Sequence, residues 1–325
     1  MTVLSIERLR IEFPLRRQVL VAVDDISLEI NAGEILGIVG ESGAGKSLTG
    51  ASLIGLLEPP GQVSSGQIRL NGRDITNLTQ RELRKIRGKQ IGAIFQDPLT
   101  SLNPLLTIGR QLTETLNAHL KLQQSEAKER AIDMLREVGI PAPEQRMSSY
   151  PHELSGGMRQ RVVIALALCC NPELIVADEP TTALDVSVQA QIILLLKKLC
   201  LKQGTAVMLV THDLGVIAEA ADRVAVMYSG RLVEIGPVGD IVENPIHPYT
   251  KGLMGSIPVI GAHKHRLAGI EGAMPRLDDR PHGCAFHPRC SHATELCRSQ
   301  QPKLTAIESS ERKSACHYND EGKFR

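Results

Sequence analysis

Short apolar runs alternate along the chain with longer stretches that are apolar on one helical face, which is the pattern of an α/β protein. The short runs at residues 35–39, 91–95, 174–177 and 206–210 are continuously apolar. Such runs are typical of strands that are covered on both faces of a parallel sheet. The sequence therefore predicts an α/β core built on parallel strands.

Two further regions have the alternation of antiparallel strands. Residues 1–36 alternate apolar and polar side chains, and residues 68–73 form a hairpin pattern whose Asn71-Gly72 pair suits a two-residue turn. Residues 222–234 return to strands around a turn at Ser229-Gly230. An antiparallel β subdomain is therefore expected beside the parallel core.

A helical subdomain is expected at about residues 97–171, between two of the core strands. Within it, residues 126–138 place apolar side chains at helical spacing. After residue 255 the composition changes, because Pro, His, Gly and Cys become frequent and long apolar strands disappear. We expect a main domain at residues 1–255 and a small cysteine-containing C-terminal extension at residues 256–325.

Charge and hydropathy restrict the possible partners. The net charge of +1 provides no general surface for nucleic acid. The N-terminus lacks the pattern of an export signal, and the longest apolar run, residues 162–170, is shorter than the ~20 residues that span a bilayer. We therefore expect a cytoplasmic protein whose cysteines are reduced thiols or metal ligands.

Residues 40–47 fit the phosphate-binding pattern G-x-x-x-x-G-K-[ST] between a predicted strand and a predicted helix. The glycines allow backbone N–H groups to converge on phosphate oxygens, and the helix N-terminus favours negative charge. Lys46 is expected to reach the β- and γ-phosphates, and the Ser47 hydroxyl to bind Mg²⁺. This motif, the P-loop, predicts use of a nucleoside triphosphate.

Two carboxylates follow the apolar strand at residues 174–177. They lie where the strands of an α/β sheet end and where such sheets bind ligands. Asp178 is expected to hold Mg²⁺, directly or through water, and Glu179 to act as general base on the attacking water. An apolar run that ends in Asp-Glu is common, so this prediction depends on the P-loop.

A second anion-binding helix start is predicted at residues 154–160, Leu-Ser-Gly-Gly-Met-Arg-Gln. Ser155 is a natural helix cap, and Gly156 and Gly157 expose the first N–H groups of the helix. One triphosphate needs only one cradle. We therefore expect this face to contact the γ-phosphate that another subunit holds.

Together these residues resemble the ATP-binding cassette (ABC) ATPases, and the resemblance covers about residues 1–250. The matching segments stand in the family's order: the P-loop, Gln96 after a strand, residues 154–160, Asp178-Glu179, Ala183-Leu184-Asp185, and His212. The resemblance implies the ABC ATPase fold, which is a P-loop core of the RecA-like kind with an antiparallel β subdomain and a helical subdomain.

The resemblance also implies the roles of individual residues. It implies a head-to-tail dimer that sandwiches two ATP molecules, with Asp185 at the subunit interface. Gln96 would sense Mg²⁺ and water, His212 would contact the γ-phosphate, and Phe13, the only aromatic residue before the P-loop, would stack on adenine. The resulting ATP-contacting set is Phe13, Gly40, Ser42, Gly43, Ala44, Gly45, Lys46, Ser47, Leu48, Ser155, Gly156 and Gly157; the catalytic set is Glu179, His212, Lys46 and Gln96; and the Mg²⁺ set is Ser47, Gln96 and Asp178.

Residues 95–104, residues 244–250 and the cysteine-bearing tail are similar to the ATPase subunits of dipeptide and oligopeptide importers. That resemblance implies ATP-driven uptake of peptides at the cytoplasmic face of the inner membrane. The implied partners are a second ATPase subunit, two membrane permease subunits and, indirectly, a substrate-binding protein. Import of nickel or another small solute stays open, and a soluble ABC ATPase acting on ribosomes or DNA is disfavoured by the single cassette.

The tail places four cysteines, Cys284, Cys290, Cys297 and Cys316, in a segment with little apolar material for a core. Four sulfurs indicate a metal centre that could replace the missing core. Their spacing lacks the close pairs of structural zinc sites and matches neither standard ferredoxin pattern. Zinc, an iron–sulfur cluster and unligated thiols therefore stay open on the residues alone, and the peptide-importer resemblance implies a [4Fe–4S] cluster.

Overall fold

The computed structural model describes residues 1–182, 184–256, 269–307 and 310–319. Its contacts divide the chain into two compact units. The first unit comprises residues 1–4, 29–35 and 70–209, and the second unit comprises residues 5–28, 36–69 and 210–325. Each unit therefore combines segments that lie far apart in the sequence.

The first unit contains three of the predicted parallel strands. They are β6 (Ile91–Ile94), β7 (Leu174–Asp178) and β8 (Ala206–Val210), in the spatial order β8-β7-β6. β6 and β7 run parallel, with Ile91 opposite Leu174 and Ile94 opposite Ala177. Almost every residue of these strands is buried, as the continuous apolar runs predicted.

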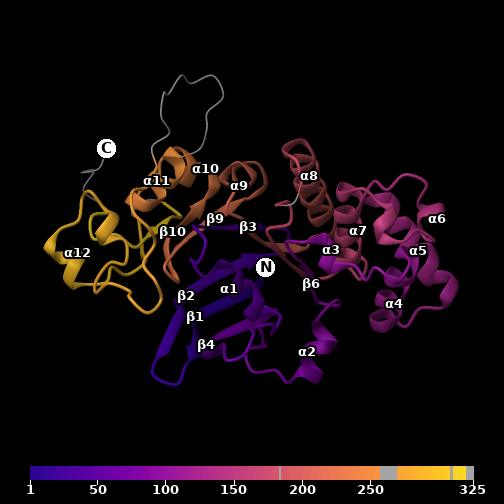
Figure 1. Cartoon of the computed structure of the whole chain (residues 1–325), viewed down its shortest axis with the longest axis horizontal. Coiled ribbons are helices and arrows are strands. Elements are labelled where there is room, and N and C mark those ends of the chain that lie inside the picture. The colour runs from indigo at the N-terminus through magenta and orange to yellow at the C-terminus, as the bar shows by residue number, and fades with distance from the viewer. Residues whose placement is uncertain (183, 257–268, 308–309, 320–325) are drawn as a thin grey trace. The chain divides into compact units, whose positions relative to one another are not determined.

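Helices fill the chain between β6 and β7. Figure 1 shows α4, α5, α6 and α7 gathered in one cluster, and α7 also contacts α3. On α5 the buried residues Ala127, Ala131, Met134 and Leu135 lie on one face, at the helical spacing seen in the sequence. The bounds in this unit are α2 Gln80–Ile86, α3 Pro98–Ser101, α4 Ile108–Leu120, α5 Gln124–Glu137, α6 Pro143–Arg146, η1 Pro151–Glu153, α7 Gly156–Leu168 and α8 Val186–Gln203.

The antiparallel strands of the N-terminal half are long. β1 (Thr2–Pro14), β2 (Val19–Asn31) and β4 (Gln62–Leu70) form a sheet in the order β2-β1-β4. In the second half of β2, buried and exposed residues alternate, as expected for a strand with one covered face. The predicted hairpin is present, since Asn71 and Gly72 have φ angles of 47° and 77° before the short strand β5 (Arg73–Asp74).

The second unit also contains a mixed sheet with the order β11-β12-β10-β9-β3. β3 (Ile35–Val39) runs parallel to β9 (Arg223–Tyr228), which pairs antiparallel with β10 (Arg231–Pro237). The C-terminal extension adds β12 (Lys313–Ser314) to β10 and β11 (Thr305–Ala306) to β12. The extension thus continues a sheet that contains the P-loop strand β3.

The helices of the second unit are short. Their bounds are α1 Lys46–Leu53, α9 Leu214–Ala220, α10 Val238–Glu243, α11 Pro248–Gly255, η2 His287–Arg289 and α12 Glu295–Ser299. The domain boundary predicted near residue 255 adjoins residues 257–268, which lie outside the described residues. In the described part of the chain, no helix has both the length and the apolar character needed to cross a bilayer.

Candidate active site

The P-loop connects β3 to α1 and needs its glycines for steric reasons. Gly40 has a φ of 152°, and a Cβ atom there would lie 2.3 Å from the carbonyl oxygen of Met227. Gly43 and Gly45 have φ angles of 83° and 99°, in the left-handed region that favours glycine. The backbone can therefore curl tightly ahead of α1, as a phosphate cradle requires.

Lys46 lies inside this curl. Its side-chain Nζ donates hydrogen bonds to the carbonyl oxygens of Gly40, at 2.8 Å, and of Glu41, at 3.1 Å. The residue is only 6% exposed. The loop thus fixes its ammonium group against its own backbone, so the residues present fit the binding of a triphosphate at this loop.

The other ATP-contacting residues predicted around the loop differ in exposure. Ser42 and Ser47 are exposed, Ala44 is fully buried, and Leu48 is half-buried in the first turn of α1. Phe13 lies near the end of β1 and is half-buried. A Cβ atom on Gly61 would lie 2.8 Å from its ring, so Phe13 lies against the chain just before β4.

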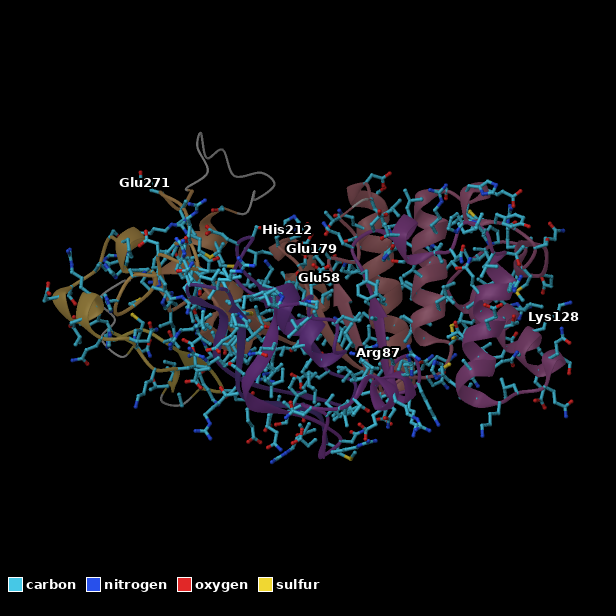
Figure 2. The ribbon with its side chains drawn as sticks, turned by 60° about the horizontal axis from the view of Figure 1, so that its bottom comes forward. Glu58, Arg87, Lys128, Glu179, His212 and Glu271 are labelled. Atoms are coloured by element: carbon cyan, nitrogen blue, oxygen red, sulfur yellow. The ribbon has the colours of Figure 1, made fainter. Side chains whose placement is uncertain are left out.

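His212 lies in the same unit as the P-loop and is exposed (Figure 2). The backbone N–H of its neighbour Thr211 donates to the carbonyl oxygen of Ile38 in the P-loop strand, at 3.2 Å. On its other side Asp213 caps α9 by accepting from the N–H groups of Gly215 and Val216. His212 is therefore presented between two fixed neighbours.

In the first unit, the structure brings Gln96 and Glu179 together. The Gln96 Nε2 donates to the Glu179 Oε2 at 3.1 Å, and the Thr182 hydroxyl donates to the same oxygen at 2.9 Å. Glu179 directly follows β7 (Figure 2), next to the half-buried Asp178 at the strand's last position. Its φ of 47° is unusual for a residue with a side chain and indicates a strained backbone.

The helix start predicted at Ser155 is also in the first unit. Ser155 is the N-cap of α7 and accepts from the Met158 N–H, and both Ser155 and Gly156 are exposed. Gln160 is 1% exposed and donates to the carbonyl oxygen of Pro180 at 2.5 Å. This hydrogen bond links α7 to Pro180, the residue that directly follows Glu179.

Asp185 caps α8 by accepting a hydrogen bond from the Val188 N–H. A structural capping role thus accompanies the interface role that the resemblance implies for Asp185. Ala183, in the same predicted segment, lies outside the described residues. Gln96, Asp178, Glu179, Asp185 and residues 155–157 belong to the first unit, whereas the P-loop and His212 belong to the second.

Sequence reasoning missed the residues that contact the P-loop from the C-terminal part of the chain. Arg289 binds both carboxylate oxygens of Glu41, at 2.7 and 2.9 Å. The Glu41 N–H donates to the Tyr249 hydroxyl at 2.8 Å. These residues are separated from Glu41 by more than 200 positions, so no local spacing could have revealed them.

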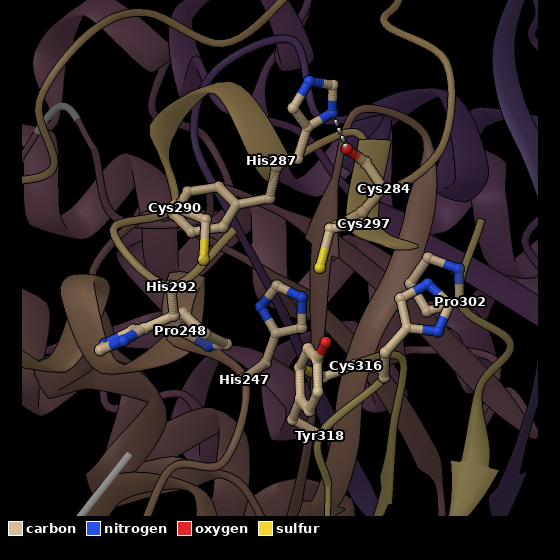
Figure 3. Close-up of a pocket in the computed structure, with 12 residues that line it drawn as sticks. His247, Pro248, Cys284, His287, Cys290, His292, Cys297, Pro302, Cys316 and Tyr318 are labelled. Carbon is tan, nitrogen blue, oxygen red and sulfur yellow. Dashed lines mark hydrogen bonds between the residues drawn. The ribbon is translucent and has the colours of Figure 1, made fainter. Parts of the chain in front are cut away.

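The four cysteines of the tail line one pocket of about 20 Å³. Figure 3 shows the sulfur atoms of Cys290 and Cys297 pointing into it. Burial raises the pKa of the Cys284 thiol to about 11, with smaller contributions from charge on the other three cysteines. No group of three or more His, Cys, Asp or Glu side chains among the described residues is arranged to bind a metal ion. The donor set thus fits a thiolate-bound metal in its chemistry, but the arrangement adds no support for one.

Two histidines near these cysteines lie at hydrogen-bonding distance from backbone carbonyl oxygens. His287 lies with its Nδ1 3.0 Å from the Cys284 carbonyl oxygen, and His317 with its Nε2 2.9 Å from the Gln300 carbonyl oxygen. None of the seven cysteines, all of which lie in the described part of the chain, forms a disulfide, and Cys169, Cys170 and Cys200 are buried in the first unit as small apolar side chains.

Comparison with known proteins gives the same family along the whole chain. The "ABC transporter" family matches residues 23–182, and "Oligopeptide/dipeptide transporter, C-terminal region" matches residues 233–297. The chain is 48% identical over 322 residues to the oligopeptide transport ATP-binding protein AppD of Bacillus subtilis (strain 168), covering 99% of this chain and 98% of that protein. It is 46% identical over 318 residues to the dipeptide transport ATP-binding protein DppD of Escherichia coli (strain K12), covering 98% and 97%.

A solved structure supports the fold. The ATP-binding cassette MJ0796, in a dimeric post-hydrolysis state bound to ADP and Pi, matches with a TM-score of 0.64 and 30% sequence identity over 72% of this chain and 98% of that one. The predicted α/β fold, with antiparallel strands, helical parts and a cysteine-containing C-terminus, is thereby confirmed. The chain belongs to the ABC transporter family of ATP-binding proteins, in the branch that carries the oligopeptide/dipeptide transporter C-terminal region.

Proposed function

We propose that this chain hydrolyses ATP to drive the uptake of dipeptides or oligopeptides, as the ATP-binding subunit of an importer. Its relatives AppD and DppD are named for oligopeptide and dipeptide transport and match nearly the full length of the chain. The C-terminal match at residues 233–297 points to the same branch. The peptide assignment rests on these likenesses, since transported solute does not contact an ATPase subunit.

The observation that carries the hydrolytic role is the hydrogen bond between Gln96 and Glu179. It holds a carboxylate at the end of a parallel strand, where it can accept a proton from water. The oxygen of that water then attacks the γ-phosphorus, the bond to the bridging oxygen breaks, and ADP leaves. His212 contacts the γ-phosphate in this proposal, and Lys46 balances its charge.

ATP is bound by residues of the P-loop and its surroundings, with Phe13 stacking on adenine. When bound, Mg²⁺ would neutralise negative charge on the phosphates. Ser47, Gln96 and Asp178 carry the hydroxyl, amide and carboxylate oxygens that this hard cation prefers. The α1 N-terminus, which follows Gly45, adds a favourable dipole for the phosphates.

The site is completed by a second ATPase subunit, either identical or a paralogue. Exposed Ser155 and Gly156 at the start of the 13-residue helix α7 offer N–H groups for a phosphate held by the partner. Asp185 lies at the subunit interface in this arrangement. The dimeric state named for the MJ0796 cassette supports the proposal.

Membrane permease subunits are the partners on the transport side. The segment from Phe95 to Leu105, which includes Gln96, exposes apolar side chains: Phe95 is 43%, Leu99 59% and Leu105 83% exposed. Exposed apolar residues that cluster in one segment favour a protein partner. We place the subunit at the cytoplasmic face of the inner membrane, with a substrate-binding protein acting on the other side.

In the extension beyond about residue 255, we propose a metal centre held by Cys284, Cys290, Cys297 and Cys316. A [4Fe–4S] cluster is the preferred occupant and zinc the alternative. The proposal rests on the chemistry of the four sulfur donors, which line one pocket, and on the resemblance to peptide-importer subunits. Iron found by metal analysis, with a visible iron–sulfur absorption band that is lost in Cys284→Ser, would support the cluster. Stoichiometric zinc in colourless protein would support zinc instead of the cluster. Metal-free protein would contradict both.

The transport role is tested by purifying the chain with its natural membrane subunits and reconstituting them in vesicles. We expect ATP-dependent uptake of a labelled dipeptide, abolished by Glu179→Gln. Uptake of nickel without peptide would overturn the substrate, and recovery of the chain with ribosomes in place of membrane subunits would overturn the role. Failure of the wild-type complex to hydrolyse ATP would overturn the proposal entirely.

A further inference from the structure

The C-terminal extension contacts the P-loop at Glu41, the second residue of the motif. The contact is bidentate, with Arg289 Nη1 and Nη2 each donating to one carboxylate oxygen. Two parallel hydrogen bonds between charged groups are among the strongest and most directional contacts in proteins. The Arg289 side chain is 5% exposed and that of Glu41 is 30% exposed, so solvent screens the pair only partly.

Arg289 is itself held from several sides within the second unit. Its Nε donates to the Glu271 carbonyl oxygen at 2.9 Å, and its Nη2 to the Ile270 carbonyl oxygen at 3.3 Å. Its guanidinium also lies near the rings of Tyr228 and Phe286, 5.8 and 6.0 Å from their centroids. An arginine fixed in this way can impose a position on its carboxylate partner.

The backbone of Glu41 is held by a second residue. Its N–H donates to the Tyr249 hydroxyl, and the Tyr249 ring packs edge-on against Tyr228. Tyr249 is fully buried on α11, which His247 caps by accepting from the Tyr249 N–H. Both the side chain and the main chain of Glu41 are therefore fixed by residues beyond position 240.

Glu41 in turn shapes the P-loop. Its carbonyl oxygen accepts hydrogen bonds from the Lys46 Nζ and from the Ala44 N–H. A continuous set of contacts thus connects Arg289 to the residue that is expected to reach the phosphates. Met274 of the extension also touches the loop, because a Cβ atom on Gly43 would lie 3.0 Å from its Cε.

We propose that Arg289 of the C-terminal extension and Tyr249 of α11 form a clamp on Glu41, and that this clamp positions the P-loop and so sets the affinity of the chain for ATP. The proposal rests on the proposed ATP site and deepens it. Arg289 is a positioning residue, since it acts on nucleotide through Glu41. Loss of the clamp weakens ATP binding while leaving the hydrolytic groups of the first unit in place.

The alternative is that Arg289 only attaches the extension to the rest of the unit. The two roles predict different effects of Arg289→Ala on ATP affinity when Glu41 is replaced by Gln. If the clamp acts through Glu41, then Arg289→Ala has little further effect on ATP affinity in a Glu41→Gln background, because residues that act as a unit are non-additive. If Arg289 only attaches the extension, the two substitutions act additively or leave ATP affinity unchanged.

The experiment measures the ATP dissociation constant, turnover at saturating ATP, and thermal unfolding without nucleotide, on the full chain in its complex. Arg289→Ala is expected to raise the dissociation constant about tenfold, with saturated turnover close to wild type. Arg289→Lys keeps the charge but not the bidentate geometry, so its ATP dissociation constant is expected to lie between those of wild type and Arg289→Ala. Arg298→Ala, on the exposed side of α12, is the matched control and should match wild type.

Unchanged ATP affinity in both Arg289→Ala and Arg289→Lys overturns the clamp, as does additivity with Glu41→Gln. If Arg289→Ala does not fold, Arg289→Lys and Glu41→Gln decide between the two roles by the same measurements. Wild-type protein that does not bind ATP would contradict the proposed function. Wild-type binding with unaffected variants would contradict the clamp alone.

Discussion

The two compact units support their functional residues in different ways. In the first unit, residues that the sequence predicts to be functional contact each other directly, as Gln96 and Glu179 do. In the second unit, the predicted P-loop is fixed by Tyr249 and Arg289, for which the sequence predicted no role at the P-loop. A motif therefore identifies the chemistry of a site, but it need not include the residues that hold the site in shape.

The difference also separates binding from catalysis. Glu179 is half-buried, and its carboxylate accepts hydrogen bonds from the side chains of Gln96 and Thr182. Lys46 is buried, and its ammonium group is fixed by loop carbonyl oxygens. We therefore expect changes in the first unit to lower turnover, and changes around the P-loop to lower ATP affinity.

The largest effect is expected for Glu179→Gln. The substitution keeps the shape of the side chain and removes the group that accepts a proton, which is worth about 10²–10⁴-fold in rate. ATP affinity should stay within the range of wild type. Steady-state turnover and equilibrium binding measure the two quantities, with the exposed Glu129→Gln as control. Turnover that survives in Glu179→Gln would remove the general-base role.

Next in size is Gly40→Ala, which tests the steric argument in the second unit. The new methyl group would lie 2.3 Å from the Met227 carbonyl oxygen, so the loop must shift. We expect weaker ATP binding and a loss of stability of about 1–3 kcal/mol. Gly72→Ala is the matched control, since Gly72 also has a positive φ of 77° but no atom within 4 Å. Equal ATP affinity in the two variants would show that the P-loop tolerates the shift.

A smaller effect is expected for Gln96→Ala. Glu179 would lose one hydrogen bond to its carboxylate, and such bonds to charged groups are worth about 1.5–3 kcal/mol. Turnover should fall roughly tenfold while ATP affinity changes little. Thr182→Val removes a second hydrogen-bond donor to the same oxygen and should lower turnover in the same way. A pure loss of ATP affinity in Gln96→Ala would instead assign Gln96 to binding.

Much of the fold followed from the sequence because local patterns determine it. The continuous apolar runs became the buried strands β3, β6, β7 and β8, and the Asn71-Gly72 pair formed the expected turn. The P-loop and Asp178-Glu179 were identifiable because phosphate chemistry requires particular residue types at short spacing. These predictions depend on neighbours in the chain, which a sequence displays directly.

Long-range contacts could not be predicted in the same way. Glu41 occupies a position where the P-loop pattern accepts any residue, and Arg289 lies in a tail without a regular pattern. Nothing in the periodicity indicates that β12 would pair with β10 and bring the tail into the sheet of the P-loop strand. The contact between Glu41 and Arg289 depends on that tertiary arrangement, so it becomes visible only in the structure.

The smallest effect on ATP affinity is expected from cysteine substitutions, one in each unit. Cys290 lines the tail pocket and directly follows Arg289, and Phe286 links that pocket to Tyr228. Cys290→Ser should therefore disturb the clamp and raise the ATP dissociation constant about two- to threefold. Cys200 is fully buried in the first unit, and burial raises the pKa of its thiol to about 12.

Cys200→Ser should act on stability alone. It places a hydroxyl group among apolar neighbours, which costs about 1–3 kcal/mol in the free energy of unfolding, and it lies outside the set of contacts around Glu41. Thermal unfolding and ATP titration of the two variants separate the two effects. If Cys290→Ser leaves ATP affinity unchanged while Arg289→Ala lowers it, the clamp works independently of the thiol pocket. If both cysteine variants weaken ATP binding equally, the loss of affinity reflects general destabilisation of the fold. The expected difference, an effect on binding in the second unit and on stability in the first, would then be wrong for the cysteines.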